Sequence, residues 1–121
     1  MQDFRKLKVW QRAQDACVRI YRLTAAYPPE ERYGLTAQLR DAGVSVGANL
    51  SEGSKRATNG DKARLWNVAQ GSAAEIMSEL DVAIRLEYAG KDEAGKLTDE
   101  YDQISGMINT LVEKVKGNDK R

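Results

Sequence analysis

Polar side chains that could do chemistry gather on residues 35–56, where glycines recur beside them at near-helical spacing. A ligand or peptide groove is one use of such a set. Acid–base catalysis by Glu52 or Glu75 is another, and it would need burial to raise a carboxyl pKa. The simpler use is a hydrogen-bonded network that fixes helix register or a subunit contact. We favour this network for the set, here called the polar seam: Gln38, Ser45, Asn49, Glu52 and Arg56, with Ser72 and Glu75 on the next helix.

Basic side chains form a second candidate site on the first predicted helix. Residues 1–27 hold six basic and two acidic side chains, although the whole chain has a net charge of only +1. A solvated helix face is the simpler interpretation. An anion-binding or nucleic-acid-binding face is the alternative, because phosphate contacts add up. The set, here called the basic face, is Arg5, Lys8, Arg12, Arg19 and Arg22.

Other reactive residues give weaker signals. The chain has no histidine, which excludes Ser-His-Asp and Cys-His sites and the Glu-x-x-His pairs of di-iron bundles. Cys17 lies on an apolar stripe and is expected to be a small buried hydrophobe. The acidic cluster of Asp99, Glu100 and Asp102 is expected to complement a helix dipole. We therefore predict no catalytic residue, no metal and no cofactor, and a protein that is not an enzyme.

The elements that must position these residues are helical. The chain of 121 residues, with two prolines, 41% hydrophobic and 31% charged residues, suits one domain that is rich in helix. Apolar periodicity predicts helices at about 4–27, 35–54, 60–89 and 93–116, followed by a polar tail at 117–121. Long helices with short connectors predict an all-α, antiparallel up-down-up-down four-helix bundle in a single domain, 1–121.

Packing is predicted from the same periodicity. Trp10 and Trp66 fall on apolar stripes and are expected in the core. Glycines in the second helix cost about 1 kcal/mol each against alanine, so we expect them where helices approach closely. The third helix has more apolar surface than one neighbour covers, which predicts self-association. The candidates for this subunit interface are Met77, Ile84 and Tyr88.

Location is predicted from what the chain contains. No apolar run approaches the ~20 residues that a membrane-spanning helix needs. The single cysteine forms no internal disulfide, and the N-terminal residues lack the apolar run of a secretory signal. We therefore expect a cytoplasmic protein with no membrane partner.

Several spaced residues are shared with a known family: Phe4, Leu7, Trp10, Tyr27-Pro28, Glu31, Tyr33-Gly34-Leu35-Thr36, Gln38-Leu39, Ser45, Ala48-Asn49, Glu52-Gly53, Arg56, Ala69, Gly71-Ser72 and Glu75. With them the chain resembles the four-helix-bundle proteins named after open reading frames in intervening sequences of bacterial 23S ribosomal RNA genes. The resemblance implies a cytosolic ring, typically a homopentamer, with no established enzymatic activity. A related branch is similar to accessory proteins of diversity-generating retroelements, which bind a reverse transcriptase and RNA. Those proteins are markedly basic and this chain is not; Asp41 also stands where the family often has a basic residue, and Gly47 where it often has proline.

Three functional hypotheses follow, in this order. The first is a non-enzymatic, homo-oligomeric assembly or adaptor protein, with a pentamer favoured by the resemblance alone. The second is an accessory nucleic-acid-binding protein that uses the basic face to bind structured RNA or a reverse transcriptase complex. The third is a small-ligand binder or an enzyme.

Overall fold

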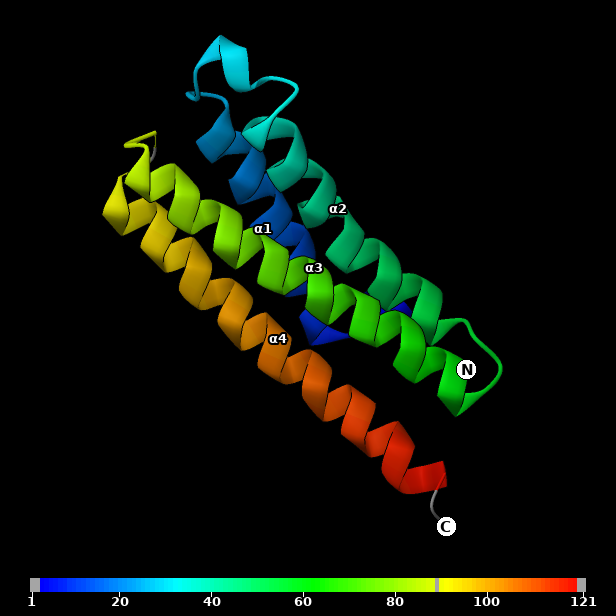
Figure 1. Cartoon of the computed structure of the whole chain (residues 1–121). Coiled ribbons are helices and arrows are strands. Elements are labelled where there is room, and N and C mark those ends of the chain that lie inside the picture. Colours follow the sequence, from blue (N-terminus) through cyan, green and yellow to red (C-terminus); the bar gives the residue numbers. More distant parts are fainter. Residues whose placement is uncertain (1–2, 89, 120–121) are drawn as a thin grey trace.

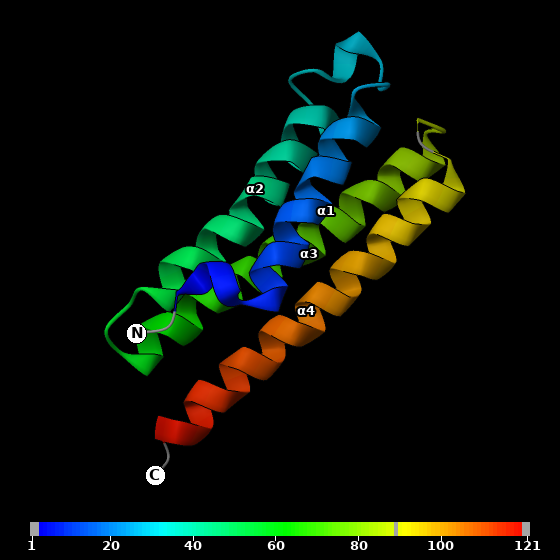
Figure 2. The same cartoon turned by 180° about the vertical axis from the view of Figure 1, so that it is seen from behind.

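In a computed structural model of the chain, residues 3–88 and 90–119 are described, the last two by their backbone alone. Among these residues lie four long helices: α1 (Lys8–Thr24), α2 (Leu35–Ser54), α3 (Asn59–Arg85) and α4 (Lys91–Asp119). Two short 3-10 helices, η1 (Phe4–Lys6) and η2 (Pro29–Glu31), precede α1 and α2. Successive long helices run in opposite directions and pack side by side (Figures 1 and 2). The described residues therefore form the predicted all-α, antiparallel four-helix bundle.

The first helix is shorter than the predicted range of 4–27. Asp3 accepts a hydrogen bond from the backbone N–H of Arg5 at 3.0 Å and caps η1, and Leu7 then adopts an extended backbone, so α1 begins only at Lys8. At the other end α1 stops at Thr24. The following Pro28 disfavours helix in the residue before it. Residues 4–7 and 25–27, the two ends of the predicted helix, are therefore not part of α1.

The boundaries of the last two helices also differ from the prediction. α3 ends at Arg85 rather than near 89, and Glu87 follows with a φ of 61°, where the backbone N–H of Tyr88 returns to the carbonyl of Ala83 at 2.9 Å. Residue 89 lies outside the described residues. α4 runs from Lys91 to Asp119, so residues 117–119 of the predicted polar tail are helical, while 120–121 are not described.

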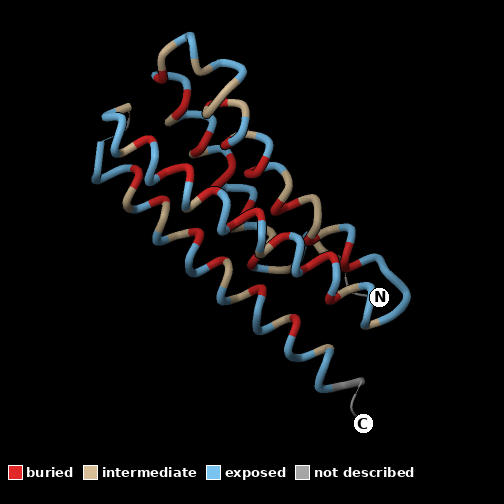
Figure 3. Tube along the Cα trace, viewed as in Figure 1, coloured by how far each residue is buried: buried red, intermediate tan, exposed pale blue. Residues whose placement is uncertain are grey.

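The core is one cluster of buried apolar side chains to which all four long helices contribute. Figure 3 colours the buried positions red along the Cα trace. Trp66 lies in it as predicted, 5% exposed, and its indole N–H donates to the carbonyl of Leu50 at 3.2 Å. Trp10 is half-buried and packs edge-on against Phe4, with ring centroids 5.2 Å apart. Cys17 is buried, as predicted, and burial raises the pKa of its thiol.

Glycines mark the close approaches of α2 to its neighbours. A Cβ at Gly43 would lie 3.0 Å from the end of Ile20 and 3.2 Å from the sulfur of Cys17, both on α1. A Cβ at Gly53 would lie 2.6 Å from the ring of Trp66 on α3. The predicted close packing of these glycines is confirmed. Gly43 lets α1 pack closely against α2, and Gly53 does the same for α3.

One end of the bundle is incompletely filled because α1 starts late. Lys8 and Val9 share a shallow surface depression with Met107 and Leu111, which places the start of α1 beside that part of α4. α4 continues past this level towards its C-terminal end (Figure 2). There η1 contacts α2, and α1 does not extend beside the C-terminal end of α4.

Candidate functional site

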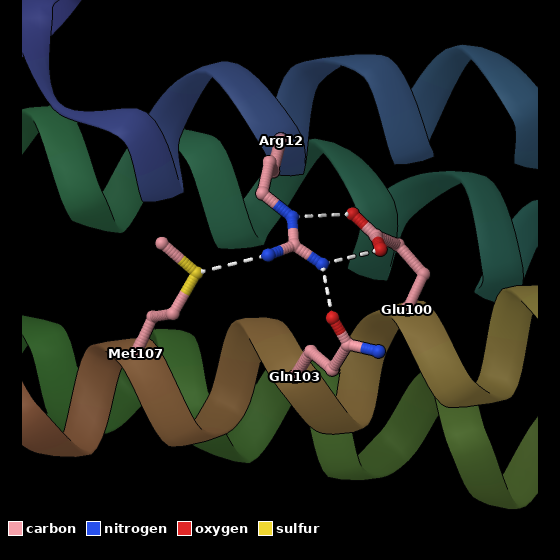
Figure 4. Close-up of polar contacts among 4 residues, drawn as sticks. All are labelled: Arg12, Glu100, Gln103 and Met107. Carbon is pink, nitrogen blue, oxygen red and sulfur yellow. Dashed lines mark hydrogen bonds and ion pairs between the residues drawn. The ribbon is translucent and has the colours of Figure 1, made fainter.

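The basic face is divided by the bundle, because Arg12 turns towards α4 (Figure 4). Its guanidinium donates two hydrogen bonds to the carboxylate of Glu100, at 2.6 and 2.9 Å. A third bond reaches the amide oxygen of Gln103 at 2.7 Å, and a fourth reaches the sulfur of Met107 at 3.4 Å. Arg12 is therefore occupied in holding α1 to α4. The dipole role predicted for Asp99, Glu100 and Asp102 is wrong, because α4 begins at Lys91 and all three lie beyond its first turn.

The other members of the basic face lie in different surroundings. Arg5 pairs with Asp3 at 3.0 Å, and Lys8 is exposed. Arg19 and Arg22 line a shallow depression that also contains Glu93. Nucleic-acid binding by the basic face stays a prediction, and it would rest on Lys8, Arg19 and Arg22 rather than on all five residues.

The Arg12–Glu100 pair makes a testable contribution to stability. Arg12 holds the pKa of the Glu100 carboxyl below its usual value. A carboxyl whose pKa is lowered in the fold stabilises it above the unfolded-state pKa, and this stabilisation is lost as the pH falls through the folded-state pKa. We expect Glu100→Gln to lower the free energy of unfolding by about 1 to 2 kcal/mol at pH 7, and by less at pH 3.

Urea denaturation at the two pH values measures this effect. Asp81→Asn is the matched control, because Asp81 also pairs with an arginine at 2.7 Å, but both side chains are more than half exposed. Exposed pairs contribute about 0 to 1 kcal/mol. Equal losses in the two variants would contradict a special role for the pair with Arg12.

Three members of the polar seam form the predicted type of network. The hydroxyls of Ser45 on α2 and Ser72 on α3 lie 3.0 Å apart. The amide of Asn49 donates to both the carbonyl and the hydroxyl of Ser45, at 2.9 and 3.0 Å. This network joins α2 to α3 near the middle of both helices.

The remaining members of the polar seam do not converge on one place. Gln38 and Glu75 are exposed and line a depression beside Ser45 and Ser72. Glu52 and Arg56 line a different one near Phe4. The two carboxylates considered for acid–base catalysis thus belong to separate depressions of the surface.

Glu79, which was not singled out from the sequence, has the largest pKa shift among the described carboxyl groups. Its side chain is 8% exposed, and its Oε1 atom has no hydrogen-bond partner among the described residues. Burial, with the charge of Glu75 and a hydrogen bond to it, raises the pKa of Glu79 to about 7. Its spacing was a usable signal: Glu79 follows Ser72 by seven residues and Glu75 by four, which puts all three on one side of α3.

The predicted interface residues Met77, Ile84 and Tyr88 are half-buried and pack against the chain's own core. Tyr88 stacks at a tilt on Tyr27, with centroids 5.7 Å apart, and its hydroxyl donates to Glu31 at 3.0 Å. Part of the surface of Met77, Ile84 and Tyr88 is therefore already covered by residues of the same chain. A role for the three residues between subunits stays a prediction.

Other apolar side chains are more exposed than these three. Apart from Tyr33, which is 87% exposed, we group them in two sets. The α3 stripe consists of Val68, Val82 and Leu86, which are 45%, 43% and 49% exposed. At about 100° per residue the three lie within roughly 40° of one another around the helix. The α1–α2 patch consists of Val18, Tyr21 and Val44, which are 47%, 42% and 50% exposed.

The unfilled end of the bundle contains a cavity of about 600 Å³. Its apolar wall consists of Leu7, Trp66, Leu111 and Val115. Four basic side chains surround it: Lys55, Arg56, Lys62 and Lys114. Only Arg56 among the four was singled out from the sequence, because they come from the loop after α2, from α3 and from α4 and share no periodic pattern.

No three histidine, cysteine, aspartate or glutamate side chains within ranges 3–88 and 90–119 are grouped so that they could hold a metal ion. In that same part of the chain, none of the helices has the length and apolar character needed to span a lipid bilayer.

The fold and the joined polar groups define a four-helix-bundle protein with a hydrogen-bonded contact between α2 and α3. The family model described as "23S rRNA-intervening sequence protein" matches residues 5–110, so the chain belongs to this family. This confirms the resemblance found in the sequence. The relation to retroelement accessory proteins stays a prediction.

One similar solved structure is the 1.70 Å crystal structure of a protein with unknown function from the S23 ribosomal protein family, from Bacteroides thetaiotaomicron VPI-5482. It is 21% identical to this chain, with a TM-score of 0.78 over 86% of this chain and 97% of that chain. At this identity the likeness supports the fold alone. No curated protein matches the chain.

Proposed function

We propose that the chain is a non-enzymatic, self-associating module that serves as an assembly platform or adaptor. The observation behind this proposal is the α3 stripe, in which three large apolar side chains remain 43% to 49% exposed along one side of a helix. Exposed apolar side chains that share one face favour contact with another protein surface. The missing histidine removes the commonest general base and supports the non-enzymatic part of the proposal.

A second copy of the chain is the partner that we propose. A closed ring needs two different surfaces on each subunit, since each contact joins one face to another. The α3 stripe and the α1–α2 patch are two such faces. Glu75 lies within about 20° of Val68 around α3, so a contact at the stripe would cover the polar seam beside it. A ring of five is favoured by the resemblance to the family.

Light scattering coupled to size-exclusion chromatography tests this proposal. We expect the wild type to elute as a homo-oligomer at micromolar concentration, and a Val68→Glu/Val82→Glu variant to elute as a smaller species with unchanged helical circular dichroism. Charges on the stripe would have to be desolvated in the contact, which costs several times what the valines contribute.

Ala74→Glu is the matched control, because Ala74 is exposed on α3 but lies about 120° from Val68. It should leave the oligomer unchanged. A monomeric wild type would overturn the proposal, and an unchanged oligomer in the double variant would exclude the α3 stripe as the contact. The ratio of absorbance at 260 and 280 nm of the same peak tests the alternative that the chain retains nucleic acid through Lys8, Arg19 and Arg22.

A further inference from the structure

The cavity at the unfilled end of the bundle exists because of how α1 begins. Asp3 caps η1 and Leu7 is extended, so the helix that would fill this end starts at Lys8. Leu7 enters the wall of the cavity instead of continuing a helix. Leu111, Lys114 and Val115 of α4 lie beyond residues 5–110, the part of the chain that the family model matches.

The inner wall of the cavity presents mainly carbon. Trp66 is almost fully buried, and its indole N–H is already donated to the carbonyl of Leu50. What Trp66 offers to the cavity is therefore the apolar part of its ring. Leu111 and Val115 from α4 and Leu7 from the start of the chain complete this wall. An apolar group placed there would lose contact with water and gain contact with these side chains.

Four positive charges surround the same cavity, and none of the described residues that line it is acidic. Lys62 donates one hydrogen bond to the carbonyl of Ser54 at 2.9 Å, which leaves two ammonium protons. The ammonium of Lys55 lies 6.0 Å from the centre of the Phe4 ring. Arg56 and Lys114 are exposed. The acidic residue Glu52 lines the neighbouring depression together with Lys55 and Arg56.

We propose that this cavity binds a small amphipathic anion, with its apolar body against Trp66 and Leu111 and its carboxylate or phosphate among the four basic side chains. The volume of about 600 Å³ lies in the range of ordinary ligand sites. An apolar wall alone would accept any hydrophobic molecule, and a charged rim alone would accept any anion. Their combination selects a molecule that has both parts. This site does not depend on the self-association proposed above.

Decanoate and decyl phosphate are suitable probes, and titration calorimetry with the purified full chain measures their binding. We expect both to bind at a single site per chain, with decyltrimethylammonium at least tenfold weaker because it brings a positive charge to the rim. Raising the salt concentration should weaken binding of the two anions, since the charges at the mouth are partly screened. A comparison of the two probes shows whether carboxylate or phosphate is preferred.

Variants locate the binding. Arg56→Gln and Lys114→Gln change exposed positions, so both should fold, and we expect their combination to weaken decanoate binding about tenfold or more. Lys116→Gln is the matched control, two residues from Lys114 on the same helix and exposed, but not in the cavity wall. No binding of either anion by the folded wild type at about 1 mM would overturn the proposal. Equal binding of decyltrimethylammonium, or equal losses in control and double variant, would also overturn it.

Discussion

Glu79→Gln is expected to raise the free energy of unfolding by roughly 1 to 3 kcal/mol at pH 8 and to change it little at pH 4. Glu79 is a buried residue of α3, with 8% of its surface exposed. Its carboxyl interacts with that of Glu75. Ionisation of Glu79 would place an uncompensated charge in this position. The glutamine amide stays neutral and still has a proton to donate to Glu75.

The direction of the pH effect follows from the raised pKa. Burial and Glu75 raise the pKa of Glu79 from 4.5 to about 7 in the folded chain. Between these two values the folded state holds a proton that the unfolded state has released, so wild-type stability falls as the pH rises. Below about pH 4.5 Glu79 is protonated in both the folded and the unfolded state, so the wild type does not bear the cost of a buried charge. The advantage of the variant should therefore grow between pH 4.5 and 7 and level off above that range.

Urea denaturation followed by circular dichroism from pH 4 to pH 8 measures this difference. Glu113→Gln is the control, because Glu113 is exposed on α4 and its change should leave the wild-type pH profile in place. A constant difference between Glu79→Gln and wild type over the whole range would show that the buried carboxyl does not titrate as described.

The second large effect is expected at Gly53. We expect Gly53→Ala to lower the free energy of unfolding by roughly 1 to 3 kcal/mol, despite the helix propensity of alanine. The new Cβ would lie 2.6 Å from the ring of Trp66 and 3.3 Å from the carbonyl oxygen of Lys62. The ring of Trp66 has little freedom to move away, because it is buried and its N–H is bonded to the carbonyl of Leu50.

A matched glycine on another helix provides the comparison. A Cβ at Gly106, on the exposed side of α4, would meet nothing within 4 Å. Gly106→Ala should therefore raise the free energy of unfolding by about 0.5 to 1 kcal/mol, as expected for an exposed helix interior. Denaturation of the two variants under the same conditions gives opposite signs if close packing at Trp66 is the cause. Stabilisation of both would mean that α2 and α3 can separate at little cost.

Local sequence patterns carried most of the information about the helices. The predicted range 35–54 and α2 have the same bounds, and Trp66 lies in the core. These features depend on the spacing of apolar residues within one helix, which is visible along the chain. The predictions were less accurate at the ends of α1 and α3, where the cap of Asp3 and the left-handed backbone of Glu87 decide the boundary.

Contacts between helices were less predictable. The basic face placed five residues on one side of the first helix, but the sequence did not show that Arg12 would meet Glu100, 88 residues away. Glu79 follows the periodic pattern of the polar seam, yet its burial depends on how closely α3 approaches its neighbours. Sequence spacing gives the direction of a side chain around its own helix. It does not show which residues of the neighbouring helices that side chain will contact.

By itself the sequence determined an all-helical bundle with a glycine-rich second helix, since helix periodicity and the cost of glycine act within one segment. Only the tertiary structure decided which charges are paired, which carboxyl is buried, and that the late start of α1 at Lys8 leaves a cavity with four basic residues around it. Those properties depend on distances between segments far apart in the chain. Such distances are set by packing the whole bundle.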